Sequence, residues 1–184
     1  MLKGGHDIII LIHHGIKHIY RENEEDMNRR NVLQSAVIAA MYIVITLITS
    51  GIAFRDVQVR LSEALCVLPI FTPTAIPGLF VGCLLANFLA GAPTADIICG
   101  SLATLIGAFG TWKLRDRKPY IALLPPIIAN QLVIPFVLKY GYKIEKPIWR
   151  MIITIGLGEI CACLILGLLL YRLLLPRREE YFEN

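Results

Sequence analysis

The stretch that decides the fold is ALCVLPIFTPTAIPGLFVGCLLANFLAGAPTA, residues 64–95, an uncharged run of 32 residues. As one helix it would measure about 48 Å, well beyond the roughly 30 Å of hydrocarbon in a bilayer. Pro69, Pro73 and Pro77 interrupt it, and proline does not fit a helix interior. The run therefore predicts two short helices with a break near residues 72–76.

Further apolar runs lie on both sides of this stretch. The chain of 184 residues is 56% hydrophobic and 17% charged, with a mean hydropathy of +0.64, against about 45–50% apolar and 25% charged in soluble domains. We therefore expect an all-α integral membrane protein, a compact bundle of six transmembrane helices. The expected helices are residues 33–52, 57–70, 77–89, 96–112, 120–138 and 150–174.

The two ends of the chain differ from this body. Residues 1–26 contain all four histidines and five acids against three bases. Residues 24–26 can be encoded as a bacterial ribosome-binding sequence just before Met27, so we expect residues 1–26 to be a leader that is untranslated or disordered. The expected membrane domain is 27–176, followed by a cytoplasmic polar tail, 177–184.

The distribution of lysine and arginine predicts the orientation. With the amino terminus inside, nine of these residues near helix ends are cytoplasmic and six are outside. Cytoplasmic loops of membrane proteins carry the excess of positive charge. We therefore expect a multi-pass protein of the bacterial cell membrane with both termini in the cytoplasm.

Charged side chains inside the apolar runs are candidate site residues, because a charge facing lipid is costly. Asp56, Arg60 and Glu63 have the spacing of one helix face. Glu159 lies roughly 13 Å into the last helix. The structural alternatives are an Arg60–Glu63 pair in a loop and a role for Glu159 as the partner of Arg60.

Amide side chains are further candidate site residues. Asn87, Asn130 and Gln131, together with Asp96, lie at a similar depth in the outer half of the expected bundle. Amides often join helices inside membranes, but their shared depth favours an outward-opening pocket. The residues expected to bind a substrate are Arg60, Glu63, Asn87, Asp96, Asn130 and Glu159.

Small residues recur every fourth position in three expected helices. Gly78 and Gly82 in the third helix and Gly100 in the fourth suit close packing within the bundle. Ala36 and Ala40 lie within two turns of the expected cytoplasmic end of the first helix and suit a partner helix.

The absence of two sequence motifs argues against some classes of enzyme. The sequence contains no Gly-x-x-x-x-Gly-Lys-Ser/Thr phosphate loop and no His-Glu-x-x-His. Its five cysteines all lie in apolar stretches, where free thiols pack as small hydrophobes. We expect no enzyme activity, no cofactor, no metal and no nucleic acid partner.

Three segments together resemble the QueT family: VQVRLSEAL (57–65), IPGLFVGCLLAN (76–87) and GSLATL (100–105). The resemblance covers about residues 28–176. It implies the substrate-binding S component of an energy-coupling factor (ECF) transporter for queuosine precursors. Its implied partners are the coupling subunit EcfT, which docks on an Ala-x-x-x-Ala pattern matched by Ala36 and Ala40, and two cytoplasmic ATPase subunits.

Queuosine precursors are 7-deazaguanines, and the implied ligand suits the candidate residues. A carboxylate can accept the adjacent N1–H and amine of the guanine edge, an amide can meet the carbonyl, and an aminomethyl group would add a cation. The alternatives are an S component for another vitamin-like substrate, a small proton-coupled secondary transporter that uses Glu159, and a purely structural membrane subunit.

Overall fold

The computed structural model describes residues 27–49 and 60–178, and within them the chain is helical and contains no strand. The chain divides into two units, residues 1–34 and 35–184, and every contact described below lies within the second. Several expected features lie outside the described residues. These are the leader, Asp56, the end of the first expected helix and residues 179–184 of the tail.

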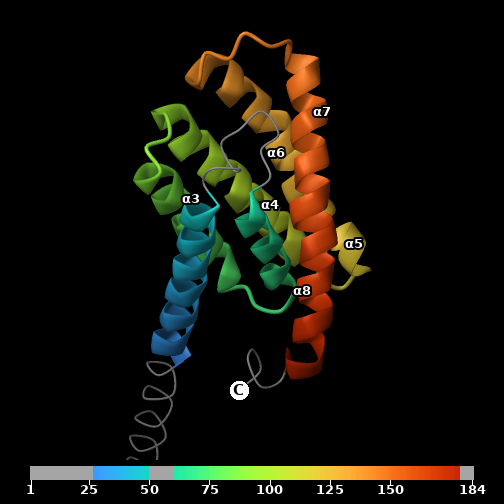
Figure 1. Cartoon of the computed structure of the whole chain (residues 1–184). Helices are drawn as coiled ribbons and strands as arrows, with labels where there is room; N and C mark the ends of the chain where they lie inside the picture. Colours follow the sequence, from blue (N-terminus) through green and yellow to red (C-terminus); the bar gives the residue numbers. More distant parts are fainter. Residues whose placement is uncertain (1–26, 50–59, 179–184) are drawn as a thin grey trace, which may run out of the picture. The chain divides into compact units, whose positions relative to one another are not determined.

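The described helices follow one another as six segments, in the predicted order (Figure 1). The segments are Met27–Ile48; η1, Leu61–Ile70; α3, Ala75–Leu89; η2, Asp96–Gly100, with α4, Ser101–Lys113; α5, Pro119–Ala122, with α6, Leu124–Phe136, and η3, Val137–Gly141; and α7, Ile148–Glu159, with η4, Ile160–Leu166, α8, Gly167–Leu174, and η5, Leu175–Arg177.

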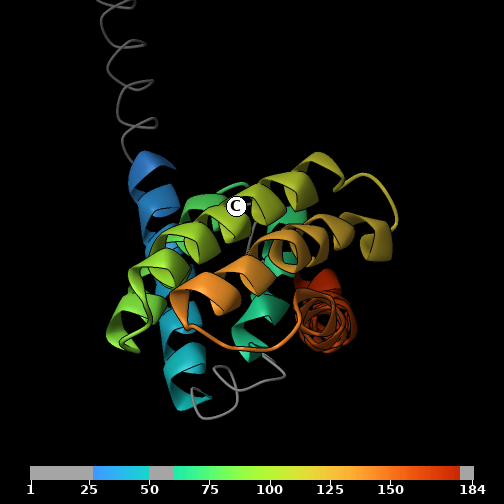
Figure 2. The same ribbon diagram turned by 90° about the horizontal axis from the view of Figure 1, so that it is seen from above.

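Three of these segments are long and apolar enough to cross a membrane: Met27–Ile48, Pro119–Gly141 and Ile148–Arg177. The segment Ile148–Arg177 is one continuous helix, which Figure 2 shows end-on. Large apolar side chains lie on the outside, including Ile48, which is 79% exposed. Such a surface is unfavourable in water and suits lipid. These features fit a multi-pass membrane protein, and crossing by the shorter helices stays a prediction.

The second helix differs from the α-helix expected over residues 57–70. Leu61–Ile70 forms a 3₁₀ helix that contains Pro69, and most of its residues are buried. Proline has no N–H to donate, so an α-helical bond at this position is lost. A 3₁₀ helix places every third residue on one line, which aligns Glu63 with Cys66. The helix is buried among its neighbours.

Glycines set the close approach of neighbouring helices. A methyl group on Gly78 would lie 2.7 Å from the Ser35 carbonyl oxygen, and one on Gly82 would lie 2.8 Å from Cβ of Tyr42. The absence of a side chain at both glycines therefore allows α3 to pack closely against the helix Met27–Ile48. The prediction that these small residues serve packing within the bundle is confirmed.

Candidate functional site

A buried ion pair joins two segments that are far apart in the sequence. Arg60 precedes the first turn of η1, and Asp96 is the first residue of η2. Nη2 of Arg60 lies 2.8 Å from Oδ2 of Asp96, and the two side chains are 5% and 0% exposed. Removal of two charges from water is costly, so this pair depends on close geometry and on further hydrogen bonds.

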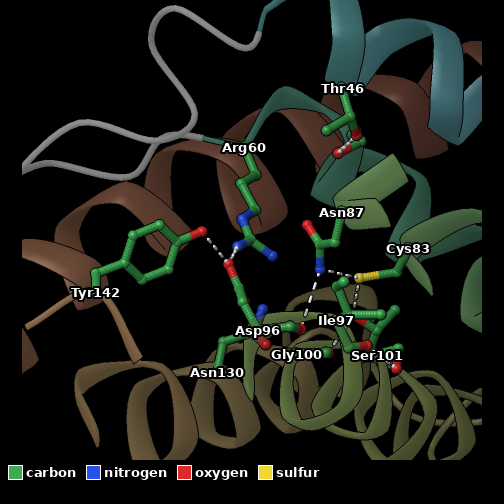
Figure 3. A network of polar contacts seen from close by, with 12 residues as sticks. Thr46, Arg60, Cys83, Asn87, Asp96, Ile97, Gly100, Ser101, Asn130 and Tyr142 are labelled. Atoms are coloured by element: carbon green, nitrogen blue, oxygen red, sulfur yellow. Dashed lines mark hydrogen bonds and ion pairs between the residues drawn. The ribbon is translucent and has the colours of Figure 1, made fainter. Parts of the chain in front are cut away.

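Two more side chains complete the surroundings of Asp96 (Figure 3). The Tyr142 hydroxyl, from the loop after η3, donates to Oδ2 of Asp96 at 2.8 Å. Nδ2 of Asn87 donates to the backbone carbonyl of Asp96 at 3.2 Å. Partial burial and the nearby Asp96 raise the pKa of Tyr142, which keeps its hydroxyl protonated and able to donate. The loop and α3 therefore both contact Asp96 of η2, the loop through its carboxylate and α3 through its backbone carbonyl.

Tyr142 was not among the residues predicted for the site. Tyr140, two residues earlier in the same part of the chain, is 72% exposed. No spacing or composition signal distinguishes these two tyrosines, because the difference arises from the path of the loop.

Gly100 leaves the space that the Asp96 side chain occupies. A methyl group on Gly100 would lie 2.7 Å from Oδ1 of Asp96 and 3.3 Å from Nδ2 of Asn87. The sequence pattern predicted a role for Gly100 in helix packing, and the structure places it against the carboxylate of the same helical segment.

We expect Gly100→Ala to lower the melting temperature of the protein in detergent, by an amount that corresponds to about 1–3 kcal/mol for overpacking. The added methyl group forces the Asp96 carboxylate away from Arg60. Gly167→Ala is the matched control, because its nearest neighbour would be Cδ1 of Leu123 at an ordinary 3.4 Å. An unchanged melting temperature for Gly100→Ala would contradict this account.

Glu63 is held by a different set of groups. Oε1 accepts a hydrogen bond from the Tyr42 hydroxyl at 2.5 Å, and Oε2 accepts one from the Cys66 thiol at 3.0 Å. Thr46 donates to Ser62 at 2.8 Å beside it. The Met27–Ile48 helix is therefore joined to η1 by buried polar contacts, and both carboxylate oxygens of Glu63 have donors.

Glu159 is the third buried carboxylate, after Asp96 and Glu63. Nδ2 of Asn130, on α6, donates to its Oε1 at 2.9 Å, and among residues 27–49 and 60–178 its buried Oε2 has no hydrogen-bond partner. Arg60 and Glu63 lie close enough for their charges to act on Glu159. Asn130 therefore joins Glu159 of α7 to the neighbouring helix α6.

All six residues predicted for the site are buried, but their pairing differs from both structural alternatives. Among the described residues, Arg60 pairs with Asp96, whereas Glu63 and Glu159 accept hydrogen bonds from other groups. The hypotheses of an Arg60–Glu63 pair and an Arg60–Glu159 pair are therefore wrong. Gln131 donates to the Ile152 carbonyl at 3.4 Å, a contact that joins two helices.

The sequence model of the QueT transporter family matches residues 32–176. This chain belongs to the QueT transporter family. The queuosine precursor transporter QueT of Lactococcus lactis subsp. cremoris (strain MG1363) is 32% identical to it over 78 residues, which are 41% of this chain and 46% of that protein. The chain thus aligns with less than half of that relative's length. No solved structure matches it significantly.

In this member of the QueT transporter family, the buried polar cluster is distinct from an apolar groove on the surface. A groove of about 450 Å³ lies between η2 and the α6–η3 segment. It is lined by Ala95, Cys99, Leu132, Val133, Phe136, Val137, Tyr140 and Gly141. None of these is a charged residue, so the groove offers no charged group to a polar substrate.

The buried cluster in this member of the QueT transporter family consists of groups that form strong hydrogen bonds. Its three carboxylates accept from N–H groups, its amides both donate and accept, and Arg60 donates. No grouping of three His, Cys, Asp or Glu side chains suited to a metal ion occurs within residues 27–49 and 60–178. The arrangement suits a planar polar molecule with several donors.

Proposed function

We propose that this chain is the substrate-binding S component of an ECF-type ABC importer and captures a queuosine precursor, a 7-deazaguanine base, for ATP-driven uptake. The observation that carries the proposal is the buried cluster around Asp96 and Glu159, which lies between apolar helices in a member of the QueT transporter family. The name of the Lactococcus relative supports the substrate class.

The cluster offers the groups that a guanine edge requires. A guanine presents two adjacent N–H donors, which a carboxylate accepts, and a carbonyl, which an amide or a guanidinium meets. Glu63 has both oxygens engaged, whereas Asp96 and Glu159 each have one oxygen with no hydrogen-bond partner in the described part of the chain. The ligand in this proposal lies between these two acids, with Asn87, Asn130 and Arg60 around it.

The energy for uptake comes, in this proposal, from the coupling subunit EcfT and two cytoplasmic ATPase subunits. Ala36 and Ala40 are both exposed on the Met27–Ile48 helix, whereas Ile38, Ala39 and Tyr42 are buried. Two small exposed residues four apart allow a second helix to approach closely. The proposal places this docking surface and both termini on the cytoplasmic side.

The decisive experiment is ligand binding by the purified full chain in mild detergent. We expect calorimetry to show saturable binding of a 7-deazaguanine with submicromolar affinity, and we expect no ATP turnover by the chain alone. Absence of binding to any 7-deazaguanine would overturn the substrate assignment. ATP hydrolysis by the solitary chain would overturn its assignment as an S component.

A proton-coupled secondary transporter is the second candidate. The buried Glu159, with one unpartnered oxygen, is the observation that favours it, because intramembrane acids often carry protons in transporters. Uptake into proteoliposomes distinguishes the two mechanisms. Uptake that requires EcfT, the ATPase subunits and ATP supports the S component, and uptake by the chain alone under a proton gradient supports the alternative.

We expect Tyr142→Phe to weaken 7-deazaguanine binding roughly tenfold, about 1.4 kcal/mol. The substitution keeps the ring but removes the hydrogen bond that orients Asp96 and fastens the loop to the site. Calorimetry on both proteins measures the effect, and Tyr140→Phe, at an exposed position, is the matched control. Equal affinity in Tyr142→Phe and the unaltered chain would show that this tyrosine has no role in binding.

A further inference from the structure

We propose that a surface pocket beside α7 binds the phosphate group of an anionic phospholipid through Lys146 and Arg150. The pocket has a volume of about 70 Å³ and lies between η3, the loop after it and α7. Its lining residues are Leu138, Ile144, Lys146, Arg150, Met151 and Thr154. The loop joins the ends of the segments Pro119–Gly141 and Ile148–Arg177 (Figure 1). None of the buried carboxylates lines this pocket.

The apolar wall of the pocket is held in place by the core. The backbone N–H of Ile144 donates to the Leu138 carbonyl at 3.1 Å, which ties the loop to η3. Lys143, just before it, has a φ of 54°, the left-handed conformation of tight turns. The Ile144 side chain packs against the buried cluster of Ile134, Leu138, Met151 and Ile155. The pocket is therefore already shaped before a ligand binds.

The charged groups that line the pocket are both positive. Lys146 and Arg150 are exposed, and no acid is among the lining residues. In the described part of the chain, no carboxylate forms an ion pair with Arg150. The Thr154 hydroxyl donates to the Met151 carbonyl at 3.1 Å, so the two cations supply the side-chain donors. A guanidinium binds two phosphate oxygens at once, and a lysine adds a compact positive charge.

An exposed apolar face of α7 and η4 continues from the pocket. Ile153, Leu157 and Ile160 follow Arg150 at three, seven and ten positions, which is the spacing of one helix face. All three side chains are exposed. A phospholipid has its phosphate beside apolar chains and matches this sequence of a cation and an apolar face. A free phosphate would use only the cation.

Two aromatic residues mark the depth of the pocket in the membrane. Tyr140 of η3 and Trp149 of α7 flank the connecting loop, and both are exposed. Exposed tyrosine and tryptophan are typical of the boundary between membrane and water. Lipid phosphates lie at this same boundary, so the two cations are at the depth where they can meet a headgroup.

The net charge of this region favours an anionic lipid. Residues 139–150 contain four basic residues and one acid, a net charge of +3. The ammonium of phosphatidylcholine would lie close to the cations of the pocket and offset the attraction of its phosphate. Phosphatidylglycerol has no such ammonium, and basic pockets beside membrane helices bind anionic headgroups.

Fluorescence quenching tests the proposal, because Trp149 is adjacent to Arg150. Trp112 is the other tryptophan of the chain, so Trp112→Phe leaves Trp149 as the single reporter. This full-length protein is reconstituted in phosphatidylcholine bilayers that contain increasing fractions of phosphatidylglycerol with brominated chains. We expect phosphatidylglycerol to bind roughly twentyfold more tightly than phosphatidylcholine, since each basic residue near a membrane surface contributes about fivefold. Lys146→Gln with Arg150→Gln should reduce this preference to about twofold or less.

Lys139→Gln with Lys143→Gln is the matched control. It removes the same charge from the same region, but neither residue lines the pocket, so the preference should remain. Quenching by brominated phosphatidylcholine checks that each variant is inserted. Equal binding of the two lipids by the protein with Lys146 and Arg150 intact, or an equal loss of preference in both double variants, would overturn the proposal. Loss of the preference in excess inorganic phosphate at constant ionic strength would show a site for a free anion and overturn its assignment to a lipid.

Discussion

Replacement of Arg60 by methionine should lower the melting temperature of the purified protein by roughly 10 °C, which corresponds to about 3–5 kcal/mol. The substitution keeps an unbranched apolar stem but leaves Asp96, which is 0% exposed, without its cation. Loss of one member of a buried ion pair costs far more than the pair itself contributes, because the remaining charge stays desolvated. Thermal unfolding in one detergent measures the effect.

A double variant separates the charge imbalance from the loss of packing. In Arg60→Met with Asp96→Asn, no uncompensated charge remains at this pair, and the amide oxygen can still accept from Tyr142. We expect it to be more stable than Arg60→Met alone, so the two substitutions are strongly non-additive. Arg115→Met, at an exposed arginine, is the matched control and should change stability by less than about 0.5 kcal/mol.

The same double variant tests whether the pair also serves the ligand. If Arg60 and Asp96 contact the substrate, the folded double variant should bind a 7-deazaguanine about a hundredfold more weakly, as expected when two charge-assisted hydrogen bonds are lost. A double variant that folds and binds normally would restrict the pair to holding η1 against η2.

Ala36→Leu or Ala40→Leu should abolish assembly with the coupling subunit and so abolish uptake. Both alanines are exposed on the Met27–Ile48 helix, so a larger side chain fits the isolated chain but holds a second helix away. We expect co-purification with EcfT and the ATPase subunits to be lost. Ligand affinity and melting temperature of the isolated chain should stay unchanged.

Cys161→Leu is the control for this experiment, because Cys161 is exposed on η4, in another segment. It adds similar bulk and should leave assembly intact. If Ala36→Leu lowers ligand affinity and stability together with assembly, these alanines support the fold of the chain. Intact assembly in both alanine variants would place the docking surface elsewhere.

The positions of the helices could be predicted from the sequence because a membrane imposes simple lengths and polarities. The expected helix at 77–89 corresponds to Ala75–Leu89, and the one at 150–174 corresponds to Ile148–Arg177. The helix type at 61–70 could not be predicted in the same way. A single proline, Pro69, and burial on most sides favoured a 3₁₀ helix over an α-helix.

The buried polar residues could be selected from the sequence, but their contacts could not. Arg60, Glu63 and Glu159 stood out because charge is rare in apolar runs, and all three are buried. Tyr42 and Tyr142, which donate to two of the acids, could not be separated from the other tyrosines. Their role depends on the helix or loop that faces them.

The sequence by itself determined that this chain is helical, that it suits a membrane, and which charged side chains lie inside its apolar runs, because these properties follow from composition and spacing alone. Only the tertiary structure decided that Arg60 pairs with Asp96, 36 residues away, and that Glu159 accepts a hydrogen bond from Asn130. Such pairings depend on which helices are neighbours and how they are rotated. Local sequence contains no record of either.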